Sequence, residues 1–236
     1  MQWIKFLLVA ILLAAAPARA AAMVETIPMA GRKRDPALAV AAMADQAPKS
    51  LDELNRIIEA NAPPWATTRA VLGEGPVGAA IAFVGEQPGD QEDLAGRPFV
   101  GPAGQLFDRA LAEVGIDRRR TYVTNAVKRF KFVQRGKRRI HAKPTMGEIR
   151  HERWWLATEL GLVRPRLTVA LGATALAALA DRALPVGANR GPRELDGRPG
   201  FVTVHPSYLL RLPDSEKAEA WAAFLADMRA IRARAA

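Results

Sequence analysis

The chain has 236 residues, enough for one sizeable hydrophobic core, and half of them are hydrophobic, which excludes a chain that is disordered throughout. Its 34 Lys and Arg against 24 Asp and Glu give a formal net charge of +10, which indicates a polyanionic partner such as nucleic acid or an anionic membrane surface. The absence of cysteine excludes disulfides, thiol nucleophiles and thiolate-ligated metal or iron–sulfur sites.

Residues 1–22 are set apart from the predicted fold. Lys5 precedes an apolar run at residues 6–16, and residues 18–20 have the small-x-small form of a signal-peptide cleavage site. The run is shorter than the ~20 apolar residues that span a bilayer. Two interpretations stay open: a secretory signal peptide, or a start assigned too early, with a later methionine such as Met23 as the first residue.

The folded domain is predicted to cover residues 50–236. Residues 23–49 alternate small, charged and proline residues without a sustained period, which is typical of a linker or tail. From Ser50 the pattern changes, because Ser50 can cap a helix whose Leu51 and Leu54 lie on one apolar face.

Four short apolar runs follow, and their near-continuous apolarity predicts strands buried on both faces of a parallel sheet. They span residues 80–84, 121–124, 167–171 and 201–204. Helical stripes separate or follow them, near residues 106–114, 155–160 and 221–231, and the Gly/Pro-rich residues 185–200 are predicted to form a loop. This alternation predicts an α/β fold, a three-layer α/β/α sandwich around a central, mostly parallel four-stranded sheet.

Polar residues follow three of the four predicted strands. Glu86 and Gln87 come after the first strand, Asn125 after the second, and His205 and Ser207 after the last. The carboxyl ends of parallel strands meet at one edge of a sheet, where ligands bind. Each segment alone is explained by an ordinary turn, but three polar segments together favour a site at this edge.

The positive charge is concentrated between residues 128 and 143, where eight basic residues occur without an acid. They are Lys128, Arg129, Lys131, Arg135, Lys137, Arg138, Arg139 and Lys143. Phe130 and Phe132 lie among them, and basic and aromatic side chains together are typical of surfaces that hold phosphates and stack on bases. The segment therefore predicts a nucleic-acid interface, with a solvated loop as the alternative.

A nearby acidic cluster allows two interpretations. It consists of Glu86, Asp90, Glu92 and Asp93. Four carboxylates could hold a divalent metal, as in nucleases, or Asp90 and Asp93 could cap a helix and favour its N-terminus. The helix interpretation is preferred, and no metal site is predicted.

Five segments carry a resemblance to a known family. They read GEQPGDQED (residues 85–93), GRPFVGPAG (96–104), TNAVK (124–128), KRRIH (137–141) and HPS (205–207). In this order they resemble the uracil-DNA glycosylase superfamily, and most closely its UdgX type, which is related to family 4. The KRRIH segment is what distinguishes the UdgX type from ordinary family 4 enzymes.

The resemblance implies an enzyme that flips deoxyuridine out of DNA and cleaves its N-glycosidic bond. It assigns Asn125 to the hydrogen-bonding edge of uracil, Phe99 to stacking on the ring, and His205 to stabilising the anionic leaving base. Gln87 corresponds to a position that often aids the attacking water. Although its amide cannot act as a base, the resemblance places Gln87 among the catalytic and uracil-binding residues.

In UdgX-type proteins the loop histidine attacks the sugar and stays attached to it. The resemblance assigns this role to His141, with Glu86 orienting or activating it. The expected DNA contacts are Lys137, Arg138, Arg139 and Ser207. Such a protein acts once on its substrate, uracil-containing DNA, with single-stranded DNA preferred. A conventional turnover glycosylase and a uracil-DNA-binding module without catalysis remain alternatives.

One departure from the family concerns its iron–sulfur cluster, which cysteines hold. The corresponding positions here are Ile58, Asn61, Arg129 and Glu152. Without a thiolate such a cluster is excluded and no cofactor is expected. Packing of Trp65, Trp154 and Trp155 is expected to replace its structural role. The DNA substrate favours a cytoplasmic location, with export as the alternative, and a monomer without a stable protein partner is expected.

Overall fold

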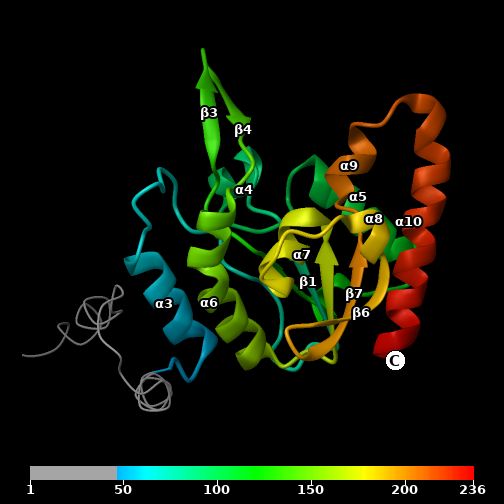
Figure 1. Ribbon diagram of the computed structural model, residues 1–236, viewed down its shortest axis with the longest axis horizontal. Coiled ribbons are helices and arrows are strands. Elements are labelled where there is room, and N and C mark those ends of the chain that lie inside the picture. Colours follow the sequence, from blue (N-terminus) through cyan, green and yellow to red (C-terminus); the bar gives the residue numbers. More distant parts are fainter. Residues whose placement is uncertain (1–46) are drawn as a thin grey trace, which may run out of the picture. The chain divides into compact units, whose positions relative to one another are not determined.

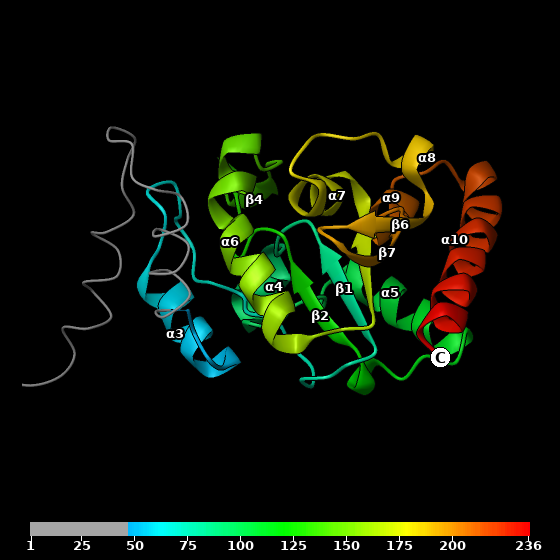
Figure 2. The same cartoon turned by 60° about the horizontal axis from the view of Figure 1, so that its bottom comes forward.

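The computed structural model describes residues 47–236. The predicted signal-like segment at residues 1–22 and nearly all of the predicted linker lie outside the described residues. The described part forms one compact unit, shown in two views in Figures 1 and 2.

A five-stranded sheet with strand order β2-β1-β5-β7-β6 forms the centre of this unit. Its strands are β1 (Ile81–Gly85), β2 (Tyr122–Asn125), β5 (Leu167–Leu171), β6 (Gly191–Leu195) and β7 (Arg198–Thr203). The first three contain buried residues only, and β1, β2, β5 and β7 pair in parallel. The predicted α/β fold class and the four predicted strands are confirmed.

The predicted number of strands was wrong, because β6 forms a fifth strand within the segment predicted to be a loop. It pairs antiparallel with β7 and lies at the edge of the sheet, where most of its residues are exposed. Pro192 has no N–H to donate, which an edge strand tolerates. An exposed strand with Gly and Pro at its start lacks the apolar pattern by which the other strands were recognised.

Helices cover both faces of the sheet (Figure 2). One core lies between the sheet and α5 (Pro102–Glu113), α9 (Pro206–Leu210) and α10 (Asp214–Ala235), and the other between the sheet and α6 (Met146–Val163) and α7 (Gly172–Ala180). Helix α3 (Leu51–Ala60) packs on α6, and its predicted cap is confirmed, because Ser50 Oγ accepts from Glu53 N at 3.2 Å. No helix within residues 47–236 is long and apolar enough to cross a membrane.

Three short helices and a hairpin complete the described residues: α4 (Asp90–Ala95), α8 (Val186–Asn189), the 3-10 turn η1 (Arg118–Arg120), and the antiparallel strands β3 (Phe132–Arg135) and β4 (Arg138–His141). Figure 1 shows the hairpin extending away from the body of the domain. Phe132 pairs with His141 at its base, and Gly136 turns the chain at its tip with φ of 57°. The basic segment is therefore an ordered β-hairpin and not an irregular loop.

A buried ion pair lies beneath the end of β2. Lys128 and Glu159 have side chains 0% and 1% exposed, and the Lys128 Nζ lies 2.6 Å from a Glu159 carboxylate oxygen. The same Nζ donates to Thr124 Oγ1 at 2.7 Å and to the Asn125 carbonyl at 2.9 Å. Tyr122 donates its hydroxyl to Glu159 at 2.9 Å. The bonds to Glu159 join β2 and the residues that follow it to helix α6, and the other two hold Lys128 against the end of β2.

Lys128→Met should destabilise the protein strongly, because it leaves the Glu159 carboxylate buried without its cation. The expected loss in the free energy of unfolding is about 3–5 kcal/mol, measured by urea denaturation. The control is Lys217→Met, which breaks an exposed pair with Asp214 and should change the free energy by less than about 0.5 kcal/mol. Equal effects of the two substitutions would contradict the prediction.

Candidate active site

The register of the sheet brings the predicted site residues to one edge. Gly85 at the end of β1 pairs with Asn125 at the end of β2, and Glu86 follows directly. β7 leads into His205, which caps α9, while β5 leads into Gly172. A Cβ on Gly172 would lie 2.9 Å from the Cβ of His205, so glycine is needed for this approach. The predicted meeting of strand ends is confirmed.

Asn125 and Phe99, which the resemblance assigns to the base pocket, pack closely over Gly85. Asn125 is 2% exposed and Phe99 is also buried. A Cβ on Gly85 would lie 2.4 Å from the Asn125 Oδ1 and 2.6 Å from the Phe99 Cζ. The ring centre of Phe99 is 5.8 Å from that of His205. An amide, an aromatic face and an imidazole thus lie together above a residue without a side chain.

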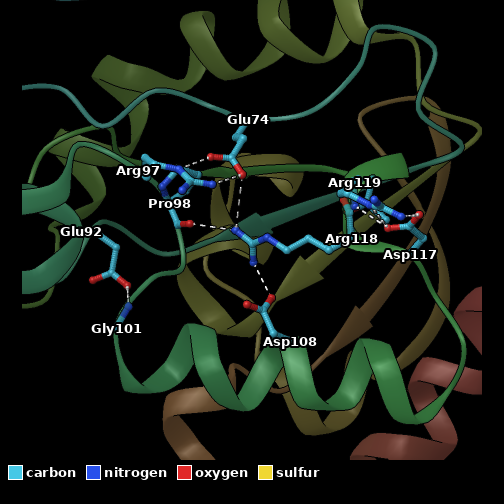
Figure 3. Close-up of polar contacts among 10 residues, drawn as sticks. Glu74, Glu92, Arg97, Pro98, Gly101, Asp108, Asp117, Arg118 and Arg119 are labelled. Atoms are coloured by element: carbon cyan, nitrogen blue, oxygen red, sulfur yellow. Dashed lines mark hydrogen bonds and ion pairs between the residues drawn. The ribbon is translucent and has the colours of Figure 1, made fainter.

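A network of ion pairs and backbone contacts holds the segment that carries Phe99 (Figure 3). Arg118 donates to the Pro98 carbonyl at 2.9 Å and to Asp108 at 2.7 Å. Glu92 accepts from the Gly101 N–H at 2.7 Å. Phe99 itself has φ of 55°, the left-handed conformation that β-carbon-bearing residues seldom adopt. The surrounding hydrogen bonds stabilise this strained backbone, which is typical of functional sites.

His205 is held as a neutral hydrogen-bond donor. Its Nδ1 accepts from the Ser207 N–H at 3.1 Å and lies 2.8 Å from the Ser207 hydroxyl. Burial lowers the pKa of His205 to about 4, with Arg211 and His141 acting in the same direction and Glu86 against it. With Nδ1 accepting, the proton is on Nε2. Ser207, predicted to contact DNA, thus also orients His205.

His141 and Glu86 form a second pair beside this pocket. The His141 Nε2 lies 3.1 Å from Glu86 Oε1, and the other carboxylate oxygen accepts from Thr174 at 2.7 Å. Burial acts to raise the pKa of Glu86, but hydrogen bonds from His141 and Thr174 outweigh it, so the pKa lies below its usual value. The His141 side chain is 48% exposed, which makes the imidazole accessible from outside. Glu86 is therefore a carboxylate that orients an accessible imidazole.

Gln87 has a role that the sequence did not predict. Its Nε2 donates to the carbonyls of Lys131 and Ala142, at 3.1 and 3.2 Å, and its Oε1 accepts from the Lys131 N–H at 3.3 Å. Both amide hydrogens are thus bonded to the two ends of the hairpin. In this structure the Gln87 amide therefore positions the hairpin, and its catalytic and uracil-binding roles remain predictions.

Arg139 folds back onto helix α4. Its guanidinium forms ion pairs with Asp90 and Asp93, and it lies over the rings of Phe130 and Phe132, 5.4 and 5.3 Å from their centres. The predicted DNA contact of Arg139 remains a prediction, but in this structure the side chain fixes the hairpin.

The acidic cluster does not converge on a metal. Asp90 and Asp93 face Arg139, and Glu92 accepts from the N–H groups of Gly89 and Gly101. No group of three His, Asp or Glu within residues 47–236 has the arrangement of a metal site. Asp90 and Asp93 do not cap α4 as predicted, because Gly89 is the N-cap and its N–H donates to Glu92 at 3.0 Å, but all three acids lie in the first turn, where they favour the helix N-terminus.

Four of the eight basic residues are buried or form ion pairs within the protein. Lys128 and Arg129 are buried, Lys131 pairs with Glu148 at 2.8 Å, and Arg139 pairs with two aspartates. The other four are exposed: Arg135, Lys137, Arg138 and Lys143. Lys137 and Arg138 therefore remain predicted DNA contacts, at the free end of the hairpin.

Comparison with known proteins agrees with this geometry. Residues 72–229 match the family described as the uracil DNA glycosylase superfamily. The chain belongs to the uracil DNA glycosylase superfamily. Among its relatives it is 40% identical over 152 residues to a type-4 uracil-DNA glycosylase of Thermotoga maritima, covering 63% of this chain and 76% of the relative. The corresponding enzyme of Pyrobaculum aerophilum is 36% identical over 154 residues, covering 61% and 74%.

This superfamily member does not fit the iron–sulfur cluster that the resemblance implied. The four corresponding positions carry Ile58, Asn61, Arg129 and Glu152. The buried Arg129 donates to the Ile58 carbonyl at 2.6 Å, and Glu152 accepts from the Lys128 N–H. An apolar side chain, an amide, a cation and one carboxylate cannot replace four thiolate or imidazole ligands. Of the tryptophans expected to fill this region, Trp155 is buried and Trp154 is 39% exposed, and their structural role remains a prediction.

The lowered pKa of His205 predicts that the stability of the protein depends on pH. Between its unfolded pKa of 6.5 and its folded value of about 4, the unfolded chain binds a proton that the folded protein rejects. The free energy of unfolding should therefore fall as the pH falls through this window, by up to ~3 kcal/mol from this group. Urea denaturation at pH 7 and pH 4.5 measures it. His205→Gln should show a smaller fall than the unsubstituted protein, and an equal fall would contradict the assignment.

Proposed function

We propose that this protein is a uracil-DNA glycosylase that remains covalently attached to the abasic sugar through His141. The observation that carries the proposal is the 3.1 Å pair of an accessible His141 with the Glu86 carboxylate, near the cluster of Asn125, Phe99 and His205. The type-4 uracil-DNA glycosylases among its relatives support the reaction class. The resemblance to the UdgX type supports the covalent outcome.

The pocket over Gly85 suits a flipped uracil. The Asn125 amide can accept from N3–H of the base and donate to O4, while cytosine presents the opposite pattern of donor and acceptor. Phe99 offers a ring face for stacking. A side chain on residue 85 would displace Asn125 and Phe99, because its Cβ would clash with both. Base selection thus depends on the fixed amide of Asn125.

His205 assists the departure of the base. When the C1′–N1 bond breaks, its electron pair leaves with uracil, and negative charge develops on the base oxygens. The neutral His205 donates its Nε2 hydrogen toward this charge, because its Nδ1 is occupied by Ser207. A donor fixed in advance costs no reorganisation when the charge develops.

His141 supplies the nucleophile. The lone pair of its neutral imidazole forms a bond to C1′ as the bond to uracil breaks, and the positive charge moves onto the ring. The Glu86 carboxylate stabilises this imidazolium and can accept its proton. Once Glu86 has accepted the proton, the neutral N-alkylated imidazole is a poor leaving group, so water does not release the sugar readily and each protein molecule acts once.

A conventional glycosylase is the second candidate, and the carboxylate of Glu86 favours it. A deprotonated carboxylate at this position can also accept a proton from an attacking water molecule. In that case His141 would only assist, and the abasic DNA would be released.

Denaturing electrophoresis with a labelled single-stranded DNA that contains one uracil distinguishes the two. We expect a protein–DNA band that survives SDS and heat, and that disappears in His141→Ala. His151→Gln, a histidine substitution outside the site, is the control and should keep the band. Alkali-induced breakage at the uracil without any such band would show a conventional glycosylase, and intact DNA would leave only a binding module.

The exposed end of the hairpin predicts the salt dependence of DNA binding. We propose that Lys137 and Arg138 contact the phosphates of single-stranded DNA, which a monomer would bind. Lys137→Ser/Arg138→Ser should weaken binding to uracil-free single-stranded DNA and reduce the slope of log affinity against log salt by about 1.4. Fluorescence anisotropy measures the slope, and Arg109→Ser on α5 should leave it unchanged. An unchanged slope in Lys137→Ser/Arg138→Ser would show that these two residues do not contact the DNA phosphates.

A further inference from the structure

We infer that Arg129 is a positioning residue. Its buried guanidinium takes the structural place of a metal cluster and connects α3 to α6 and to the segment that follows β2. In this way it fixes the base of the hairpin that carries His141. One of the two tests of this inference, the measurement of product partition, rests on the proposed function. The inference follows from contacts of Arg129 in three directions, toward α3, toward α6 and along the chain to the hairpin.

Toward α3, Arg129 forms a long-range backbone contact. It is 3% exposed, and its Nη2 donates to the Ile58 carbonyl at 2.6 Å, although 71 residues separate the two. Ile58 lies in the last turn of α3, where carbonyl groups have no partner within the helix. A cation at this end of a helix also interacts favourably with the helix dipole.

Toward α6, the same guanidinium packs on an aromatic ring. The Arg129 Cζ lies 5.8 Å from the ring centre of Trp155, a distance at which a cation and an indole attract each other. Trp155 forms a small core of its own with Leu54 and Ile58 of α3. This core is separate from the two that cover the sheet, so Arg129 lies where α3 is attached to the domain.

Along the chain, the next residue connects Arg129 to the active site. Phe130 N–H donates to Thr68 Oγ1 at 3.0 Å, and the Thr68 hydroxyl donates back to the Phe130 carbonyl at 3.2 Å. The buried Phe130 ring stacks on Phe132 with centres 5.3 Å apart and lies 6.3 Å from the ring of His141. A shift of Arg129 is therefore transmitted to His141 through one aromatic side chain.

Stability alone does not explain a cation at this place. Burial lowers the pKa of Arg129, while the nearby Glu152 opposes the effect, and burial raises the pKa of Glu152. Within the described residues no protein group forms a hydrogen bond with Arg129 Nε, Arg129 Nη1 or Glu152 Oε1. Because buried charges with incomplete hydrogen bonding are costly, an apolar residue would be expected here if packing were the sole requirement.

Hydrogen exchange of the full chain tests the positioning role directly. In Arg129→Met we expect amide exchange in residues 51–61 and 130–142 to accelerate about tenfold or more, while β1 and β5 keep their protection. Arg56→Met, an exposed arginine of α3, is the matched control and should exchange like the unsubstituted protein. Unchanged exchange in the two segments, or an equal acceleration everywhere, would overturn the inference. If Arg129→Met does not fold, Arg129→Gln decides by the same criteria.

Product partition provides the second measurement. With protein in excess over uracil-containing DNA, Arg129→Met should lower the ratio of covalent adduct to alkali-labile abasic DNA several-fold, because His141 is displaced while the base pocket is retained. An unchanged ratio alongside locally faster exchange would refute the link from Arg129 to His141. If the unsubstituted protein releases uracil without forming an adduct, the proposed trapping fails, and hydrogen exchange still decides the role of Arg129.

Discussion

The parallel register between β1 and β2 is the constraint on which the site depends. It pairs Gly85 with Asn125, so that the amide of Asn125 lies over a residue without a side chain. Lys128, buried against Glu159, holds the Asn125 carbonyl from below. The chain that leaves β1 then supplies Glu86, and the chain that leaves β2 supplies the hairpin with His141. A shift of one residue in this pairing would separate all of these groups.

The positive charge of residues 128–143 serves two purposes that composition cannot separate. Part of it is structural: Lys128, Arg129, Lys131 and Arg139 are buried or paired with acids of other segments. The remainder is exposed on the hairpin and beyond it, where phosphates can reach it. The hairpin is thus held at its base by internal ion pairs and by the amide of Gln87, while its free end stays available to a polyanion.

The sequence was sufficient for the buried strands and for the residues at their ends, for a physical reason. Continuous apolar runs specify strands covered on both faces, and parallel strands bring Glu86, Asn125 and His205 to one edge. β6 and the hairpin lacked such a signal, because exposed strands with Gly191, Pro192 or Gly136 resemble loops. The roles of Gln87 and Arg139 depend on partners 44 to 55 residues away, and no local pattern encodes such contacts.

The proposed nucleophile and the proposed base-binding residues belong to different parts of the fold. Asn125, Phe99 and His205 belong to the sheet and its connections, whereas His141 is carried by a two-stranded ribbon that shares no strand pairing with that sheet. If His141 acts as proposed, changes confined to this hairpin alter the fate of the abasic product without repacking the core or changing the residues that recognise the base. The same separation offers a route for engineering. A hairpin of this kind could be transplanted together with the acids of α4 that hold it. On the proposed function, an enzyme that releases its product would then become a reagent that stays bound to the lesion.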